Sequence, residues 1–219
     1  MWALVKDKPE VGLTMKRVEI PQVGDNDVKI KIHKTAICGT DVHIYQWNEW
    51  AQETIRLGTT AGHEYVGEIV EVGKNVTSAK VGDIVSGEGH IVCGTCRNCR
   101  AGKGHLCRNT KGVGVNRDGA FAEYVKIPAD AVTRGNLMVL PEGVSPAEAA
   151  VTEPLSCAYN GFTKLFVKPG EYAMVVGAGP IGFCHAMLLH MAGAAVLMND
   201  ISAERLADIK SRLPFVETY

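Results

Sequence analysis

The chain has 219 residues, of which 46% are hydrophobic and 21% charged, and its formal net charge is −1. This length suits one or two domains, and the composition excludes a disordered or fibrous chain. The balance of 23 basic against 24 acidic residues argues against a dedicated binder of nucleic acids or anionic membranes. Lys6, Asp7 and Lys8 lie where a secretory signal would need an apolar core. We therefore expect a cytoplasmic protein that has no membrane or nucleic-acid partner.

The first 150 residues are expected to form a β-rich domain. Residues 28–32 alternate apolar and polar side chains, as a strand with one solvated face does. Residues 65–72 and 122–127 behave similarly. Short strands with irregular connections predict a compact, barrel-like unit.

The pattern changes near Ser145, which is a predicted helix N-cap with Pro146 in the first turn and Glu148 at the third position. From there to the end, strands and helices alternate, which predicts the beginning of a parallel βαβ fold. The expected elements are a strand over 172–176, a helix over 181–191, a strand over 195–198 and a helix over 202–213.

Residues 172–199 contain no Asp, Glu, Lys or Arg. The stretch is long enough to cross a bilayer. However, a strand, a helix and a second strand of a parallel sheet, buried on both faces, have the same composition. The glycines inside the stretch favour this buried interpretation.

Four cysteines, Cys93, Cys96, Cys99 and Cys107, lie within 15 residues. Four thiolates this close together can converge on one tetrahedral zinc. An iron–sulfur cluster is the main alternative, but the ferredoxin pattern has a shorter last gap and a proline after its final cysteine, where this chain has Arg108. A site closed by four cysteines has no open position, so its zinc would be structural.

A second set of candidate ligands is spread along the chain: Cys38, His63, Glu64 and Glu153. A catalytic zinc needs about three protein ligands and one position left open. His63 and Glu64 are adjacent, so their side chains would point to opposite faces of a regular strand. Both can bind one metal only where the backbone is irregular, or where Glu64 and Glu153 alternate as ligands.

The third motif is Gly177-x-Gly179-x-x-Gly182, which follows a predicted strand and opens a predicted helix. These glycines let the backbone approach a pyrophosphate at the positive end of the helix. Asp200 follows the next strand, where an acidic residue binds the adenosine ribose hydroxyls. Because Asp200 would repel a 2′-phosphate, the motif favours NAD over NADP.

Together these residues resemble the zinc-dependent medium-chain dehydrogenase family. The resemblance rests on TAICGTDVHIYQWNEW, GHEYVGE, SGEGH, CGTCRNCRAGKGHLCRNT and GVGVNRDGAFAEY, within about residues 1–128. It implies a GroES-like catalytic domain over 1–150, followed by the start of a Rossmann domain over 151–219. The N-terminal part is most similar to the branch that oxidises L-threonine to 2-amino-3-oxobutanoate. A sorbitol, other polyol or butanediol dehydrogenase is the alternative, and a non-catalytic, zinc-stabilised fragment is another.

The resemblance also implies roles for single residues. It implies a structural zinc on the four clustered cysteines and a catalytic zinc on Cys38, His63 and Glu64, with Glu153 as an exchanging or water-mediated carboxylate. Thr40 and His43 match a proton-relay pair, and Asp41 matches the residue that orients the histidine ligand. The positions expected to line NAD are Gly177, Gly179, Ile181, Gly182, Asp200 and Arg205.

The resemblance further implies a small-molecule alcohol as substrate and homo-oligomers among full-length members. Members of the family continue well beyond Tyr219, so we expect this chain to carry only two strands of the Rossmann sheet.

Overall fold

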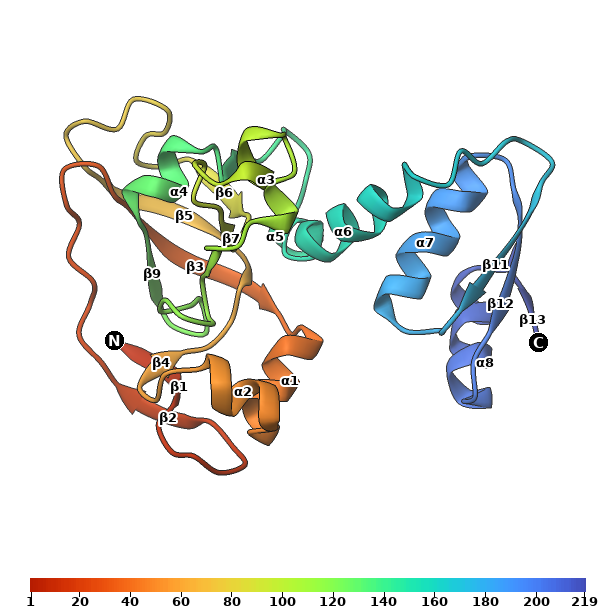
Figure 1. The fold of residues 1–219 in the computed structure, drawn as a ribbon, viewed down its shortest axis with the longest axis horizontal. Helices are drawn as coiled ribbons and strands as arrows, with labels where there is room; N and C mark the ends of the chain where they lie inside the picture. The colour runs from red at the N-terminus through yellow and green to blue at the C-terminus, as the bar shows by residue number, and fades with distance from the viewer. The chain divides into compact units, whose positions relative to one another are not determined.

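The computed structural model describes residues 1–219. The chain forms two compact units, Met1–Thr152 and Glu153–Tyr219. The elements of both units are labelled in Figure 1. No helix has the length and apolar character that a membrane span requires, and the uncharged stretch over 172–199 is divided into a strand, a 12-residue helix and a second strand.

The first unit is built on a five-stranded antiparallel sheet with the order β10-β6-β5-β3-β9. A three-stranded sheet, β2-β1-β4, and a two-stranded sheet, β7-β8, complete its strands. The strands are β1 (Trp2–Lys6), β2 (Thr14–Arg17), β3 (Val28–Ala36), β4 (Thr59–Thr60), β5 (Glu64–Val72), β6 (Ile84–Gly87), β7 (His90–Ile91), β8 (Lys111–Gly112), β9 (Tyr124–Ile127) and β10 (Leu137–Val139).

Short helices occupy the connections of the first unit. Helix α5 begins as the sequence predicts, because the Ser145 side chain accepts from the Glu148 backbone N–H while the Glu148 carboxylate accepts from the Ser145 N–H. The helices are α1 (Gly39–Gln46), α2 (Glu49–Thr54), α3 (Arg97–Arg100), α4 (Ala129–Thr133) and α5 (Pro146–Ala149), with one 3-10 turn, η1 (Gly104–Leu106).

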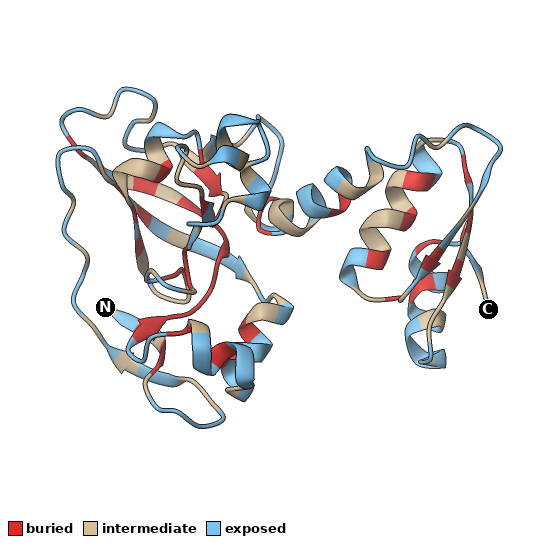
Figure 2. Ribbon diagram, in the orientation of Figure 1, coloured by how far each residue is buried: buried red, intermediate tan, exposed pale blue.

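The alternation read from the sequence sets the core of this unit. Val28 and Ile30 of β3 are fully buried, whereas Lys31 is exposed. Ile69 of β5 and Val125 of β9 join them in one cluster, and Figure 2 shows the buried positions running along the strands. Each such aliphatic side chain contributes about 1.5–3 kcal/mol when fully buried.

The second unit contains a parallel sheet with the order β11-β12-β13. The sequence predicted two strands, and this number is wrong, because the last residues, Glu217–Thr218, pair with β12 as a third strand. The elements are α6 (Thr152–Phe162), β11 (Tyr172–Val176), α7 (Pro180–Met191), β12 (Ala195–Asn199), α8 (Ala203–Arg212) and β13 (Glu217–Thr218).

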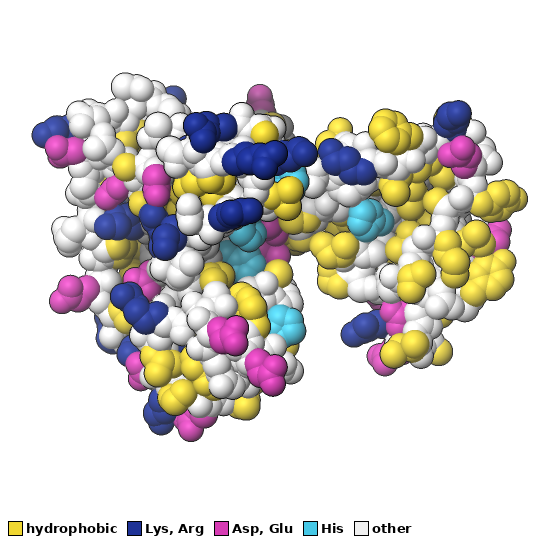
Figure 3. All heavy atoms as spheres, in the orientation of Figure 1, with side chains coloured by type: hydrophobic (Ala, Val, Ile, Leu, Met, Phe, Trp, Pro, Cys, Tyr) yellow, Lys and Arg dark blue, Asp and Glu magenta, His cyan; other side chains and the backbone are white.

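Only one face of this sheet is covered by helices of the second unit. Helices α7 and α8 pack against the face that carries Val175 and Met198, since right-handed connections that advance in one direction place both helices on the same side. On the other face, Tyr172, Met174 and Val176 are 61–79% exposed, and hydrophobic side chains are visible on the surface of this unit in Figure 3. The expectation of burial on both faces is therefore wrong for β11.

Candidate functional site

The four clustered cysteines form one site in a single loop. Their Sγ atoms all lie within 4.8 Å of one another, with 4.0 Å between Cys93 and Cys99 and 3.5 Å between Cys96 and Cys99. A tetrahedral zinc with Zn–S bonds of about 2.3 Å requires S–S separations of about 3.8 Å. The spacing of the thiols therefore fits one zinc ion.

The backbone of this loop is shaped to hold thiolates. Backbone N–H groups of Cys96 and Cys93 point at the sulfurs of Cys93 and Cys107, at 3.4 and 3.3 Å. Hydrogen bonds from the Thr95 and Cys96 backbone lower the pKa of the Cys93 thiol to about 5. The thiolate is the form that binds metal, so these hydrogen bonds favour metal binding by Cys93 near neutral pH. Burial and the neighbouring thiols raise the pKa of Cys99 in the same loop.

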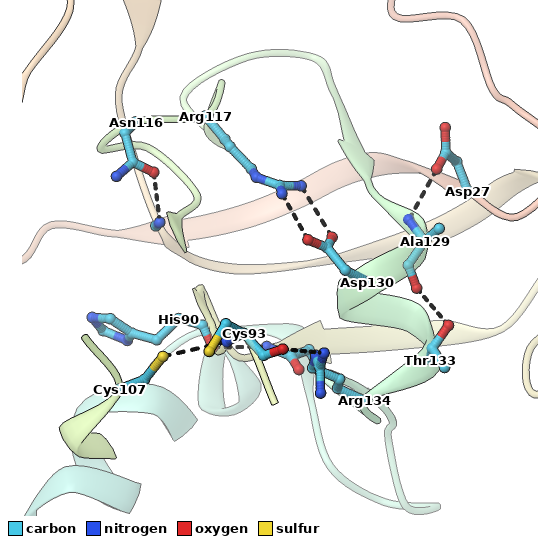
Figure 4. A network of polar contacts seen from close by, with 12 residues as sticks. Asp27, His90, Cys93, Cys107, Asn116, Arg117, Ala129, Asp130, Thr133 and Arg134 are labelled. Atoms are coloured by element: carbon cyan, nitrogen blue, oxygen red, sulfur yellow. Dashed lines mark hydrogen bonds and ion pairs between the residues drawn. The ribbon is translucent and has the colours of Figure 1, made fainter. Parts of the chain in front are cut away.

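Arg134, which the sequence analysis did not single out, ties this loop to the C-terminal end of α4. Its guanidinium donates to the Cys93 carbonyl at 2.7 Å, as Figure 4 shows. Gly94 leaves room for it: φ is +72° at this position, and a Cβ atom there would lie 2.0 Å from the Arg134 guanidinium. No spacing pattern in the sequence could have indicated a contact over 41 residues.

A second set of ligands is assembled from two segments of the first unit. The Sγ of Cys38, a nitrogen of His63 and a carboxylate oxygen of Glu64 lie within 4.8 Å of one another. The antiparallel pairing of β3 and β5 explains this, since Ala36 at the end of β3 is opposite Glu64 at the start of β5. Cys38 follows two residues later, as the N-cap of α1.

The irregular backbone that two adjacent ligands require is present. His63 precedes β5 rather than lying in it, and Gly62 before it has φ +90°. A Cβ atom at Gly62 would lie 2.3 Å from the Phe121 ring, so only glycine fits. His63 and Glu64 are consequently not held to the alternation of a regular strand.

Asp41 supports both segments of this set. One carboxylate oxygen accepts the Cys38 backbone N–H at 2.9 Å, and the other lies 3.5 Å from His63 Nδ1. Burial opposes charge on His63, but Asp41 and Cys38 outweigh it and raise the pKa of His63 to about 9. Asp41 Oδ1 and His63 Nδ1 are buried with no hydrogen-bond partner. A thiol, an imidazole and a carboxylate beside a buried acid fit a zinc ion with an open position.

The other residues predicted for catalysis lie on helices. Thr40 and His43 are three residues apart on α1, so they share one face of that helix. Glu153 belongs to the second unit, in the first turn of α6. Its part in the ligand set stays a prediction.

The glycine motif of the second unit forms a tight turn between β11 and α7. Gly177 has φ +108°, and a Cβ atom at Gly182 would lie 1.9 Å from the Gly177 carbonyl oxygen. Gly179 is the N-cap of α7 and Pro180 follows it in the first turn. The backbone N–H groups that begin this helix, including that of Ile181, have no partner four residues earlier and suit an anion.

Asp200 lies beside this turn, after β12. Its carboxylate accepts backbone N–H groups from Ala178 at 2.7 Å and Ser202 at 2.8 Å. These bonds, and then the charge of Arg205, hold the pKa of Asp200 below its ordinary value. Ala178, Ser202 and Arg205 line a groove of about 600 Å³. The structure thus brings Asp200 and Arg205 together next to the glycine turn.

Comparison with known proteins finds a matching family model and a similar relative. The model of the alcohol dehydrogenase GroES-like domain matches residues 24–138. L-threonine 3-dehydrogenase of Chelativorans sp. (strain BNC1) is 53% identical over 208 residues, which are 94% of this chain and 59% of that protein. The chain therefore spans less than two thirds of the length of this relative.

Two solved structures are similar throughout this chain. An alcohol dehydrogenase from E. coli CFT073, complexed with the cofactor NADH, is 30% identical with a TM-score of 0.87; the match covers 100% of this chain and 62% of that one. The 2R,3R-butanediol dehydrogenase of Bacillus subtilis is 27% identical with a TM-score of 0.86, covering 100% and 63%. The predicted fold class, a GroES-like β-rich domain followed by an α/β unit with a parallel sheet, is confirmed.

Proposed function

The chain belongs to the family of alcohol dehydrogenases with a GroES-like domain, and from that premise we propose that it oxidises a secondary alcohol with zinc and NAD. The observation that carries this proposal is the set of half-buried Cys38 with buried His63 and Glu64, beside buried Asp41. Unlike the four-cysteine loop, this set offers three ligands of different chemistry, which leaves a coordination position for substrate.

We propose a division of labour between the two ligand sets. Cys93, Cys96, Cys99 and Cys107 would hold a structural zinc that fixes their loop. Cys38, His63 and Glu64 would hold the catalytic zinc, with Glu153 exchanging for Glu64. Bound at this second set, zinc supplies Lewis acidity that lowers the pKa of the substrate hydroxyl.

The protein's own residues orient the ligands and move the proton. Asp41 faces Nδ1 of His63, so it would orient the ring and leave Nε2 as the nitrogen that could hold the metal. Thr40 and His43, on one face of α1, would carry the hydroxyl proton away from the buried site. His43 is exposed, which suits the solvent end of such a path.

The second unit would bind the cofactor. Gly177, Gly179 and Gly182 would let the backbone approach the pyrophosphate, and Ile181 and Arg205 would line the site. Asp200 is held in its charged form by two backbone N–H groups. A carboxylate there accepts hydrogen bonds from ribose hydroxyls and repels a 2′-phosphate, which supports NAD rather than NADP.

We propose L-threonine as the substrate, because of the 53% identity to L-threonine 3-dehydrogenase. A vicinal diol or a polyol is the second candidate, supported by the similarity to a butanediol dehydrogenase. Both are small secondary alcohols that require the same zinc and NAD chemistry, so the choice between them does not alter the roles of the residues above.

Two measurements on the purified protein test the proposal. Metal analysis should find two zinc ions per chain, and Cys38→Ser should retain one. NADH absorbance should then rise with L-threonine and not with butanediol or sorbitol, and Cys38→Ser should abolish the rise. Two zinc ions with no NADH from any alcohol would favour a non-catalytic, zinc-stabilised module instead.

A further inference from the structure

The turn between α1 and α2 contains a hydrogen bond that the proposed function does not explain. The side-chain amide of Asn48 lies 2.9 Å from Nδ1 of His43. Asn48 is also the N-cap of α2, and its Oδ1 accepts the Ala51 backbone N–H at 3.0 Å. One side chain therefore contacts both the start of a helix and the imidazole of His43.

The cap determines which way the Asn48 amide is oriented. A backbone N–H can only donate, so the atom that faces Ala51 must be the Asn48 oxygen. The other end of the amide is then the NH₂ group, which can only donate as well. Nδ1 of His43 must therefore be the acceptor. In a neutral imidazole one nitrogen accepts and the other carries the proton, which leaves the proton on Nε2.

Several contacts keep Asn48 in this place. Its own backbone N–H donates to the His43 carbonyl at 3.4 Å. The residue before it, Trp47, has the left-handed φ of +56° and ψ of +44° that ends α1. The buried ammonium of Lys6 donates to the Tyr45 carbonyl at 3.3 Å and lies 4.9 Å from the centre of the Trp47 ring. The turn is thus anchored to β1 on one side and to α2 on the other.

We propose that Asn48 is a positioning residue, which holds the neutral ring of His43 in the tautomer with its proton on Nε2. His43 then presents a donor, not an acceptor, at the nitrogen that does not face Asn48. The fixed tautomer of His43 is inferred from these contacts alone. Its importance for catalysis rests on the proposed proton path through His43.

The direct test is the ¹⁵N NMR spectrum of the histidine rings in the zinc-loaded protein, at a pH where the ring of His43 is neutral. His43→Gln identifies the resonances of His43 among the seven histidines, because only those resonances disappear. We expect a pyridine-like shift for Nδ1 and a pyrrole-like shift for Nε2. A pyrrole-like Nδ1 in the wild-type protein would overturn the inference.

Two substitutions separate the hydrogen bond from the helix cap. Asp, Asn and Ser are comparable N-caps, so Asn48→Asp and Asn48→Ser both preserve the start of α2. The carboxylate introduced by Asn48→Asp would accept from Nδ1, so the two ¹⁵N shifts should exchange character. Asn48→Ser removes the amide group that donates to Nδ1 of His43. The ratio of the Nε2-protonated to the Nδ1-protonated tautomer should therefore fall by about fivefold, the factor that a hydrogen bond worth about 1 kcal/mol produces. Shifts that stay as in the wild type in both variants would show that Asn48 does not set the tautomer.

The NMR experiment can contradict the tautomer proposal without contradicting the proposed function, and the reverse also holds. If His43 has the expected tautomer but no alcohol yields NADH, the role of Asn48 is supported and the proposed dehydrogenase activity is wrong. If NADH forms and depends on His43 while Nδ1 is pyrrole-like, the proposed activity is supported and the proposed role of Asn48 is wrong.

Discussion

The two candidate zinc sites are built in opposite ways. All four sulfurs of the loop site come from 15 consecutive residues, 93–107, and each cysteine is half-buried. The second site takes Cys38 from beyond the end of β3 and His63 from before β5, and two of its three ligands are buried. The loop carries its own backbone donors to sulfur, whereas the second site depends on Asp41 and on strand pairing.

Because of this difference, we expect substitutions at one site to leave the other site intact. The loop site needs only that its own chain segment closes, so its metal and its shape stabilise each other. The second site needs the β3–β5 pairing, the turn at Gly62 and a buried acid to be in place before a metal arrives. Substitutions that affect one set should therefore leave the other set occupied.

The largest effect is expected from Cys96→Ser. Loss of one thiolate should empty the loop site and lower the free energy of unfolding by roughly 4 kcal/mol, while the second zinc stays. Zinc content and urea unfolding measure both. Cys184→Ser, in a half-buried cysteine of the second unit, is the control and should retain two zinc ions. Iron with visible charge-transfer absorption in the wild-type protein would contradict a zinc loop altogether.

Gly62→Ala should damage only the second site, the set of Cys38, His63 and Glu64. The new methyl group would meet the Phe121 ring, and overpacking of this kind costs about 1–3 kcal/mol beyond the strain of a positive φ. Gly58→Ala is a matched control, because Gly58 has φ +93° and no atom near a Cβ position. We expect only Gly62→Ala to lose the second zinc. Equal unfolding midpoints for the two variants would show that the contact with Phe121 is unimportant.

These two sites also differ in how far the sequence reveals them. The CxxCxxC spacing describes the loop site almost completely, because its ligands are local. For the second site the sequence supplied the residue types, and the family resemblance supplied the role of Asp41 beside the histidine ligand. Neither supplied the pairing of Ala36 with Glu64, which depends on the register of two strands. Arg134 and Asn48 were missed because their partners are defined only by the folded backbone. The third parallel strand, β13, was missed because two residues are too short to show a period.

Asp41→Asn should have a smaller effect, a loss of zinc affinity at the second site only. The amide keeps the size of the side chain but removes the charge that faces His63 Nδ1. A supporting carboxylate of this kind typically contributes 10–100-fold to metal affinity, so competition with a chelator should show that loss at one zinc and no change at the other. Asp130→Asn removes an acid that pairs with Arg117 instead, and should leave both affinities unchanged. Equal weakening of both zinc ions in Asp41→Asn would mean that the sites are coupled.

The smallest effect is expected at Asp200, an acid that also joins two backbone segments but does so in contact with solvent. Its pKa is held below the ordinary value by the N–H groups of Ala178 and Ser202. A carboxyl group whose pKa is lower in the folded state stabilises fully above its unfolded pKa, about 3.9, and loses that contribution as the pH falls through the folded value. The difference in melting temperature between the wild type and Asp200→Asn should therefore be constant near pH 7 and shrink below about pH 4. Asp208→Asn, which removes an acid paired with Arg212, controls for the change in net charge. A difference that is the same in strong acid as at neutral pH would mean that Asp200 acts through its shape rather than its charge, and that the electrostatic argument for NAD over NADP lacks its basis.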